Sequence, residues 1–371
     1  MTQPTQAMPR AAGVGVSCAS AGLGGAGAVG AEEAATAATA ATPASPAASA
    51  TALTAVDRQP AAEHAEPARY PDVDVVVPTR DRPELLRLTI DSVLAQDYSG
   101  VVRVVVVFDQ SEPDLTLVRA DPHRPVLVVS NGRRPGLAGS RNSGILASRG
   151  ELVAFCDDDD VWLPGKLSAQ VTMMRSDPTA AVVSCGIRID YDGTLVDRVL
   201  PTTTVQLRDL LRDRLTELHP STFLMRRSAV LEGFGLVDEA VPGSFGEDYE
   251  FLLRSARTGP VRTVPEVGVV VRWHKQSYFT SRWETMAQGL SWLLERYPEF
   301  ASVRAGEARV AGQVAFATAA HGDRRGSLRW VRRTVGRNPL EPRAYLALAV
   351  ASGVVKPDSI VRRLHDRGRG I

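Results

Sequence analysis

An alternation of apolar strands with helices between residues 73 and 156 constrains the fold of this chain most strongly. Val101–Phe108 is a nearly continuous apolar run, which is typical of a strand buried on both faces of a parallel sheet. Similar runs and the helical stretches between them cover Val73–Val77, Glu84–Gln96, Val126–Val129, Leu137–Ser148 and Leu152–Cys156. This alternation predicts right-handed crossovers and an open, mainly parallel α/β sheet.

The last of these strands ends in four consecutive aspartates. In an extended chain, Asp157 and Asp159 would face one side, and Asp158 and Asp160 the other. Two carboxylates roughly 6 Å apart repel by about 3 kcal/mol at an effective dielectric near 20, so a divalent cation would turn repulsion into binding free energy. Such oxygen ligands suit Mg²⁺ or Mn²⁺. The alternative is a solvated acidic turn before a helix opened by Pro164.

Polar residues follow three of the predicted strands. They are Pro78-Thr79-Arg80, Asp109-Gln110-Ser111 and the aspartate run. Ligands of open α/β sheets bind beyond the carboxyl ends of the strands. We therefore expect these three segments to line one crevice.

The composition excludes some classes of protein. The 43 Lys and Arg residues balance 42 Asp and Glu residues, so no basic field attracts nucleic acid. No apolar stretch has the length of a membrane-spanning helix. The three cysteines form neither a metal spacing nor a disulfide framework, which suits a reducing cytoplasm. Residues 1–69 are rich in Ala, Gly, Ser, Thr and Pro and are expected to be disordered.

The alternation becomes looser after Lys166. The elements expected there are strands over Ala181–Ile189, Thr222–Met225 and Val267–Arg272, a helix over Glu247–Thr258, and mainly helices from about Arg282.

Five motifs occur in one order along the chain. They are Val75-Val76-Val77-Pro78-Thr79-Arg80-Asp81-Arg82, Val105-Val106-Val107-Phe108-Asp109-Gln110-Ser111, Gly136-Leu137-Ala138-Gly139-Ser140-Arg141-Asn142, Phe155-Cys156-Asp157-Asp158-Asp159-Asp160-Val161-Trp162-Leu163-Pro164 and Gly246-Glu247-Asp248-Tyr249. Together they resemble the family 2 glycosyltransferases over about residues 72–280. The resemblance implies an inverting enzyme with a GT-A fold that binds a nucleotide-diphosphate sugar.

The resemblance also implies roles for residues on the nucleotide side. Pro78, Thr79 and Arg80 would line the nucleotide pocket, and Asp109 would accept a hydrogen bond from the base. This chain has Phe108 where the family often has the first acid of an Asp-Asp-Gly-Ser segment. Asp109 is therefore the expected contact with the base.

A second group of implied roles concerns the diphosphate and the metal. Arg141 and Asn142 match the Arg-Asn pair of the family, which lies near the nucleotide. Asp157 and Asp159 align with the acids of the Asp-X-Asp motif, and Asp159 is the principal expected ligand of Mn²⁺ or Mg²⁺. Asp157 would support the metal or the donor, and Asp158 is placed with the donor-binding residues. Asp160, by contrast, is expected only to lead into the following helix.

The remaining implied roles concern catalysis. Asp248, beside Glu247, aligns with the general base that deprotonates the acceptor hydroxyl, and His274 matches a histidine near the diphosphate or metal. A cation would stabilise the leaving phosphate as a Lewis acid, and a carboxylate would accept the proton. Structural alternatives stay open: Glu247 would complement a helix dipole, and His219 is more often structural than catalytic.

The chain is expected to divide into three parts. Residues 1–69 precede a GT-A catalytic domain over 70–280, with a nucleotide-binding half (70–166) and an acceptor-binding half (167–280), and a helical extension over 281–371 follows. Gly322–Ile371 has 12 basic and four acidic residues, a net charge of +8. Its apolar residues Leu328, Val331 and Val335 share a helical face that would lie on an anionic membrane or, as favoured, pack on the catalytic domain.

The predicted function is metal-assisted transfer of a sugar to a hydroxyl acceptor, in the synthesis of a cell-envelope polysaccharide, a glycolipid or a glycosylated secondary metabolite. The acceptor would be a glycan, a lipid-linked sugar or a small molecule, in the cytoplasm or at the inner face of the membrane. One alternative is a nucleotidyltransferase, but Thr79-Arg80-Asp81-Arg82-Pro83 is not a Gly-rich phosphate loop. The other is a non-catalytic carbohydrate-binding or scaffold protein, although both acidic motifs are intact.

Overall fold

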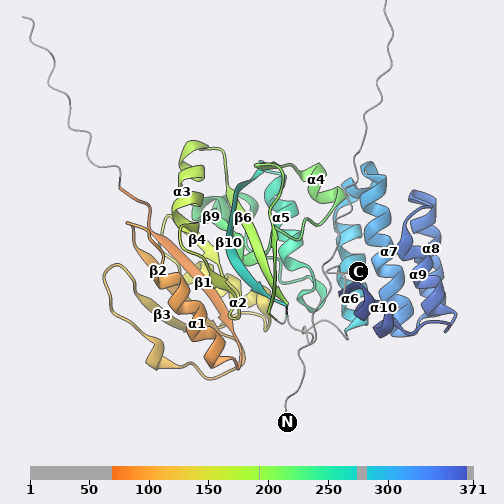
Figure 1. Cartoon of the computed structure of the whole chain (residues 1–371), viewed down its shortest axis with the longest axis horizontal. Helices are drawn as coiled ribbons and strands as arrows, with labels where there is room; N and C mark the ends of the chain where they lie inside the picture. The colour runs from red at the N-terminus through yellow and green to blue at the C-terminus, as the bar shows by residue number, and fades with distance from the viewer. Residues whose placement is uncertain (1–68, 192, 274–281, 366–371) are drawn as a thin grey trace, which may run out of the picture. The chain divides into compact units, whose positions relative to one another are not determined.

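The computed structural model describes residues 69–191, 193–273 and 282–365, and Figure 1 shows their arrangement. The prediction of disorder for residues 1–69 falls, up to residue 68, outside the described residues, as does His274. Ten strands form one sheet in the order β3-β2-β1-β4-β9-β6-β10-β5, with β7 paired to β6 and β8 to β10. The predicted α/β fold with a mixed, mainly parallel sheet and C-terminal helices is confirmed.

The first half of the sheet is parallel. Its elements are β1 (Val73–Thr79), α1 (Pro83–Leu94), β2 (Val102–Phe108), β3 (Val126–Ser130), α2 (Leu137–Ala147) and β4 (Leu152–Phe155). Every residue of β1 is buried because a helix covers each face of the sheet. Val75 and Val77 pack in the cluster that contains α1, whereas Val76 packs with α2. α2 lies so close to β1 that a methyl group on Gly144 would be 2.2 Å from Val76 Cγ1.

The second half of the sheet is mixed. Its elements are β5 (Val161–Trp162), α3 (Lys166–Ser176), β6 (Val182–Tyr191), β7 (Thr194–Arg198), β8 (Thr204–Val205), α4 (Leu207–Arg212), β9 (Leu224–Arg226), α5 (Glu247–Ala256) and β10 (Val261–Arg272). Short helical turns are η1 (Leu115–Leu117), η2 (Pro220–Thr222), η3 (Ala229–Phe234), η4 (Pro242–Ser244) and η5 (Pro298–Ser302). β9 runs antiparallel to both β4 and β6. β10 begins six residues before the predicted strand, because the register shift beside Pro265 interrupts the apolar pattern.

The C-terminal part consists of helices packed around α7. They are α6 (Trp283–Arg296), α7 (Arg304–His321), α8 (Arg324–Arg337), α9 (Pro342–Ala351) and α10 (Pro357–His365). α7 is rich in buried Ala and Gly, which lets neighbouring helices approach closely. A methyl group on Gly306 would lie 1.8 Å from the carbonyl oxygen of Leu211, so α7 also packs directly on α4. In Figure 1 the helices α6 to α9 stand side by side next to α4 and α5.

The apolar stripe of the basic C-terminal segment is mostly used for packing. Val331 is buried, Val335 packs against the same cluster as Phe316, and Leu328 remains half exposed. The stripe therefore packs against the other C-terminal helices, and its predicted packing on the catalytic domain stays a prediction. Among the described residues, no helix combines the length and apolar character needed to cross a bilayer.

Candidate active site

The aspartate run forms a tight turn instead of continuing the strand. The backbone N–H of Asp160 donates to the carbonyl oxygen of Asp157 at 3.1 Å, which closes a four-residue turn. The expectation that alternate aspartates share a side is therefore wrong. Asp158 and Asp159 face Arg82, whereas Asp157 and Asp160 lie together beside His219. The turn brings the first and last acids together because it reverses the chain between them.

Asp158 and Asp159 lie beneath the end of β1. Thr79 Oγ1 donates to Asp158 at 2.8 Å, and Arg82 Nη1 donates to Asp158 at 3.2 Å and to Asp159 at 2.7 Å. Burial raises the pKa of Asp158 to about 6, although Thr79 and Arg82 oppose the shift. Sequence reasoning gave Arg82 no role, because its ion pairs with residues 76 and 77 positions away leave no local pattern. Arg80, predicted to line the same pocket, has an exposed side chain next to Asp81, and Pro78 is buried in β1.

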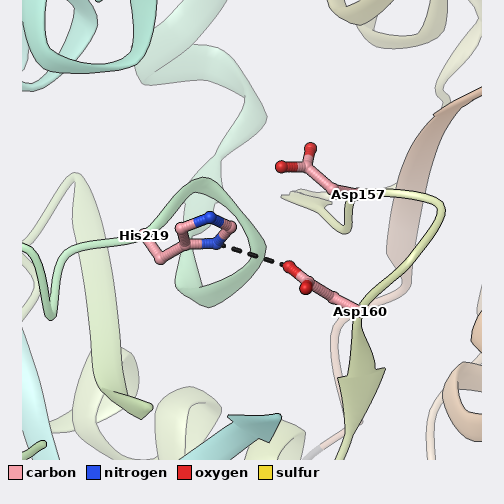
Figure 2. A group of neighbouring side chains, drawn as sticks. All are labelled: Asp157, Asp160 and His219. Atoms are coloured by element: carbon pink, nitrogen blue, oxygen red, sulfur yellow. Dashed lines mark ion pairs between the residues drawn. The ribbon is translucent and has the colours of Figure 1, made fainter. Parts of the chain in front are cut away.

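Asp157, Asp160 and His219 form a compact group (Figure 2), in which one ligand atom from each lies within 4.8 Å of the others. His219 Nδ1 lies 3.4 Å from Asp160 Oδ2, and Ser221 Oγ donates to the same oxygen at 2.5 Å. Burial raises the pKa of Asp160 well above its ordinary range, and the charges of Asp157 and Asp159 add to this effect. Burial has the opposite effect on His219, whose pKa it lowers because the charged imidazolium is disfavoured. The sequence predicted only that Asp160 leads into the following helix. It did not predict that His219, 59 residues after Asp160, would lie beside it.

Lys166, six residues after the aspartate turn, is buried inside the protein. Its Nζ is 3.6 Å from the centroid of the Trp162 ring and donates to Gln170 at 2.8 Å. Burial lowers its pKa to about 8. The Trp162 indole N–H in turn donates to the carbonyl oxygen of Ser221 at 3.1 Å, so the ring fixes the segment that carries His219.

Arg141 connects the aspartate turn to α5. This fully buried side chain donates to Asp157 at 2.9 Å and to Glu247 at 2.7 Å. These two carboxylates hold its pKa above the ordinary value even though burial opposes the charge. Burial raises the pKa of Glu247, and Arg141 counteracts part of that shift. The link holds the first aspartate of the turn in a defined relation to the residue before Asp248.

Asp248 lies at the N-terminal turn of α5 and is paired with Arg214. Arg214 Nη2 donates to Asp248 Oδ2 at 2.6 Å. Burial would raise the pKa of Asp248, but Arg214 and Arg141 outweigh it and keep the pKa below its ordinary value. Asp248 is therefore ionised at neutral pH. Sequence reasoning missed Arg214 because it lies in an irregular segment without a motif.

Asp109 and Asn142 each anchor a loop through hydrogen bonds. Asp109 accepts from Asn131 Nδ2 at 2.8 Å and from the Gly136 N–H at 3.0 Å, which ties the end of β2 to the start of α2. Asn142 Nδ2 donates to the carbonyl oxygen of Val237 at 2.8 Å and to Glu239 at 2.7 Å, and Asn142 Oδ1 accepts from the Val237 N–H at 2.9 Å. Asn142 thus holds the segment ahead of α5 in place.

The sequence and fold have recognisable relatives. Residues 74–234 match the family model described as Glycosyl transferase family 2. The uncharacterized protein Rv1520 of Mycobacterium tuberculosis is 26% identical over 297 residues, which are 75% of this chain and 80% of that one. The Escherichia coli UDP-Glc:alpha-D-GlcNAc-diphosphoundecaprenol beta-1,3-glucosyltransferase WfgD is 29% identical over 102 residues, 28% of this chain and 40% of that one. The structure of S. aureus TarS 1–349 in complex with UDP-GlcNAc aligns with a TM-score of 0.55 and 16% identity, over 80% of this chain and 92% of that one.

The fold, with acidic and basic groups gathered where the parallel strands end, is of the GT-A type. The chain carries a family 2 glycosyltransferase domain, and the protein is a glycosyltransferase. The alternatives of a nucleotidyltransferase and of a non-catalytic scaffold are not favoured by this assignment.

Proposed function

We propose that the protein transfers a sugar from a nucleotide-diphosphate donor to an acceptor hydroxyl by a single in-line displacement that inverts the anomeric centre. One observation carries this proposal: Arg141 joins Asp157 of the aspartate turn to Glu247, the neighbour of Asp248. A displacement needs a donor site and a base at a fixed separation, because misplacement of reacting groups is costly. A buried arginine that donates to both carboxylates supplies that rigidity.

The aspartate turn would hold Mn²⁺ or Mg²⁺. Asp157 and Asp159 each offer a carboxylate, although the turn directs Asp159 towards Arg82 and Asp157 towards His219. Carboxylate oxygens suit these hard cations, and an excess of negative charge around Asp160 favours a cation nearby. Asp157 also belongs to a second donor set with Asp160 and His219, in which an imidazole joins two carboxylates. When bound, the cation stabilises the negative charge that develops on the leaving diphosphate. His274, the third predicted ligand, stays a proposal because it lies outside the described residues.

Asp248 would act as the general base. It is kept ionised by Arg214, which also holds the carboxylate in one orientation through the 2.6 Å contact. An ionised carboxylate within reach of the acceptor hydroxyl accepts its proton as the oxygen attacks the sugar carbon. Glu247 positions this base through Arg141 and does not itself need to change its protonation state.

Nucleotide binding tests the donor side of the proposal. UDP, GDP and dTDP are titrated calorimetrically into the protein with Mn²⁺ and again with EDTA. We expect Mn²⁺-dependent binding of at least one nucleotide and an affinity at least about tenfold lower in Asp159→Ala, which corresponds to about 1.4 kcal/mol. Asp91→Ala, an exposed aspartate of α1, is the matched control and should bind normally. Unchanged metal-dependent binding in Asp159→Ala would contradict the role of Asp159.

Electron spin echo spectroscopy of bound Mn²⁺ separates the two donor sets. Nitrogen coupling that disappears in His219→Ala would show that the set with Asp160 and His219 holds the metal. Absence of nitrogen coupling in the unaltered protein would instead support the carboxylates of Asp157 and Asp159. Either spectrum identifies the ligands directly, because imidazole nitrogen is the distinguishing donor.

The acceptor and the location of the reaction are further parts of the proposal. A relative is named for glucosyl transfer to a lipid-linked sugar, which supports a role in polysaccharide synthesis on the cytoplasmic side of a membrane. Residues 70–166 would bind the nucleotide and residues 167–280 the acceptor, with residues 281–371 as a helical extension. Exposed Arg324, Arg325 and Arg332 of α8 would allow a peripheral contact with anionic lipid, and cosedimentation with phosphatidylglycerol vesicles tests it.

A further inference from the structure

A groove between the C-terminal helices and the segment that precedes the candidate base has the composition of a carbohydrate site. It has a volume of about 440 Å³ and lies between α6, α7, α8 and η4. Its lining includes two half-buried indoles, Trp292 on α6 and Trp330 on α8. Around them lie the polar residues Gln288, Ser291, Glu295, Thr318, Asp323 and Arg329.

From this groove we infer a binding site for a neutral oligosaccharide, the non-reacting part of a glycan acceptor. A pyranose ring has an apolar C–H face and a rim of hydroxyls, so it fits a pocket that pairs aromatic rings with a few polar groups. Ser291 and Thr318 donate their hydroxyl protons to their own helix, at 2.6 and 2.7 Å, which leaves their oxygens as acceptors for sugar hydroxyls. This inference rests on the proposed glycosyl transfer and adds the class of acceptor.

The charges of the rim argue against an anionic ligand. Of the residues that line the groove, Glu295 and Asp323 carry carboxylates and Arg329 a guanidinium, and the guanidinium of Arg333 lies 5.2 Å from the centroid of the Trp330 ring. Asp323 uses one oxygen to accept from the Gly326 N–H at 2.8 Å, at the start of α8. A phosphate or a lipid headgroup would therefore meet no net positive charge at this groove, whereas uncharged hydroxyls would find both donors and acceptors.

The groove is continuous with the segment that leads to the base. Pro242, one of its lining residues, belongs to η4, and the chain runs from η4 directly into α5, where Asp248 lies. α6 packs tightly on this segment: a methyl group on Gly289 would lie 2.6 Å from the carbonyl oxygen of Phe245. A methyl group on Gly243 would lie 2.2 Å from Thr285 Cγ2. A glycan held by α6 and α8 is therefore held relative to the residues that precede Asp248.

Titration of the full-length protein with cello-, laminari-, manno- and maltopentaose tests this inference. Binding is followed by intrinsic tryptophan fluorescence and by calorimetry. We expect at least one pentaose to bind saturably below about 10 mM and its affinity to fall at least about tenfold in Trp292→Ala and in Trp330→Ala. Because these indoles also contact the core, the exposed pair Gln288→Ala and Arg329→Ala is made as well and should weaken binding without loss of folding. Arg332→Ala, on the same helix but outside the groove, is the control and should bind normally.

Nucleotide binding, measured in the same variants, separates this inference from the proposed transfer. The groove variants should bind nucleotide with unchanged affinity. Failure of the unaltered protein to bind any nucleotide would count against the proposed function alone. Failure to bind any of the four pentaoses, or equal binding by the groove variants, would overturn the glycan site alone.

Discussion

The clustered aspartates should destabilise the metal-free protein, and Asp158 offers the clearest way to measure this. Its pKa of about 6 exceeds the ordinary value of 3.8 because the side chain is buried. The folded protein therefore binds this proton more tightly than the unfolded chain does. The free energy of unfolding decreases as the pH rises through this interval, and the full cost of about 3 kcal/mol is reached near pH 7.5.

Asp158→Asn removes this ionisation. The amide oxygen can still accept from Thr79, and the attraction of Arg82 for the carboxylate is already part of the pKa of about 6. In EDTA near pH 7.5, we therefore expect the variant to be more stable by about 3 kcal/mol. Near pH 5 the cost in the unaltered protein falls to about 1.6 kcal/mol, so the difference should shrink to about that value.

Urea denaturation at several pH values, followed by circular dichroism, measures both quantities. Asp81→Asn is the matched control, because this nearby carboxylate is largely exposed and its replacement should change stability by less than about 0.5 kcal/mol. An Asp158→Asn variant that is less stable than the unaltered protein near neutral pH would show that ionised Asp158 does not destabilise the fold. So would a stability difference that does not vary with pH.

Three further predictions follow from buried charges around the site. Arg141→Met breaks a buried pair with Glu247 and should lower the free energy of unfolding by about 3–5 kcal/mol, measured in urea; a loss under about 1 kcal/mol would contradict the pairing. Arg214→Leu should raise the pKa of Asp248, so the acidic limb of the pH–rate profile should move to higher pH; an unmoved limb would exclude Asp248 as the titrating base. The pKa of Lys166 is about 8, below the ordinary 10.5, so the free energy of unfolding should increase as the pH rises from 8 towards 10. Lys166→Met should be more stable at neutral pH and should lack this increase. Parallel curves of unfolding free energy against pH for the variant and the unaltered protein would contradict this prediction.

The strands in the parallel half of the sheet could be predicted from the sequence, because strands of this kind share one simple pattern. Strands buried on both faces must be apolar throughout, so β1, β2 and β4 were recognisable within one or two residues at each end. The strands in the second half of the sheet are harder to predict from the sequence. β7 is largely exposed and polar, and β10 carries a bulge, so neither gives a clean period.

The arrangement inside the site was harder to predict than its membership. The sequence identified Asp157, Asp159 and Asp248 as candidates but treated the aspartates as an extended strand, whereas a backbone hydrogen bond closes them into a turn. Arg82 and Arg214 were missed, because an ion pair between residues far apart in sequence leaves no local pattern. Periodicity reports which face of an element is buried, but it does not report which distant cation meets a given carboxylate.

The proposed mechanism joins a metal-dependent donor site to a carboxylate base. A panel of nucleotide-diphosphate sugars, incubated with Mn²⁺ and a pool of glycan acceptors, tests this through the release of nucleoside diphosphate. We expect release from at least one donor, abolished by EDTA, and a fall of about 10²–10⁴-fold in Asp248→Asn while Mn²⁺-dependent nucleotide binding is retained. Release that persists in EDTA, or full turnover by Asp248→Asn, would contradict it.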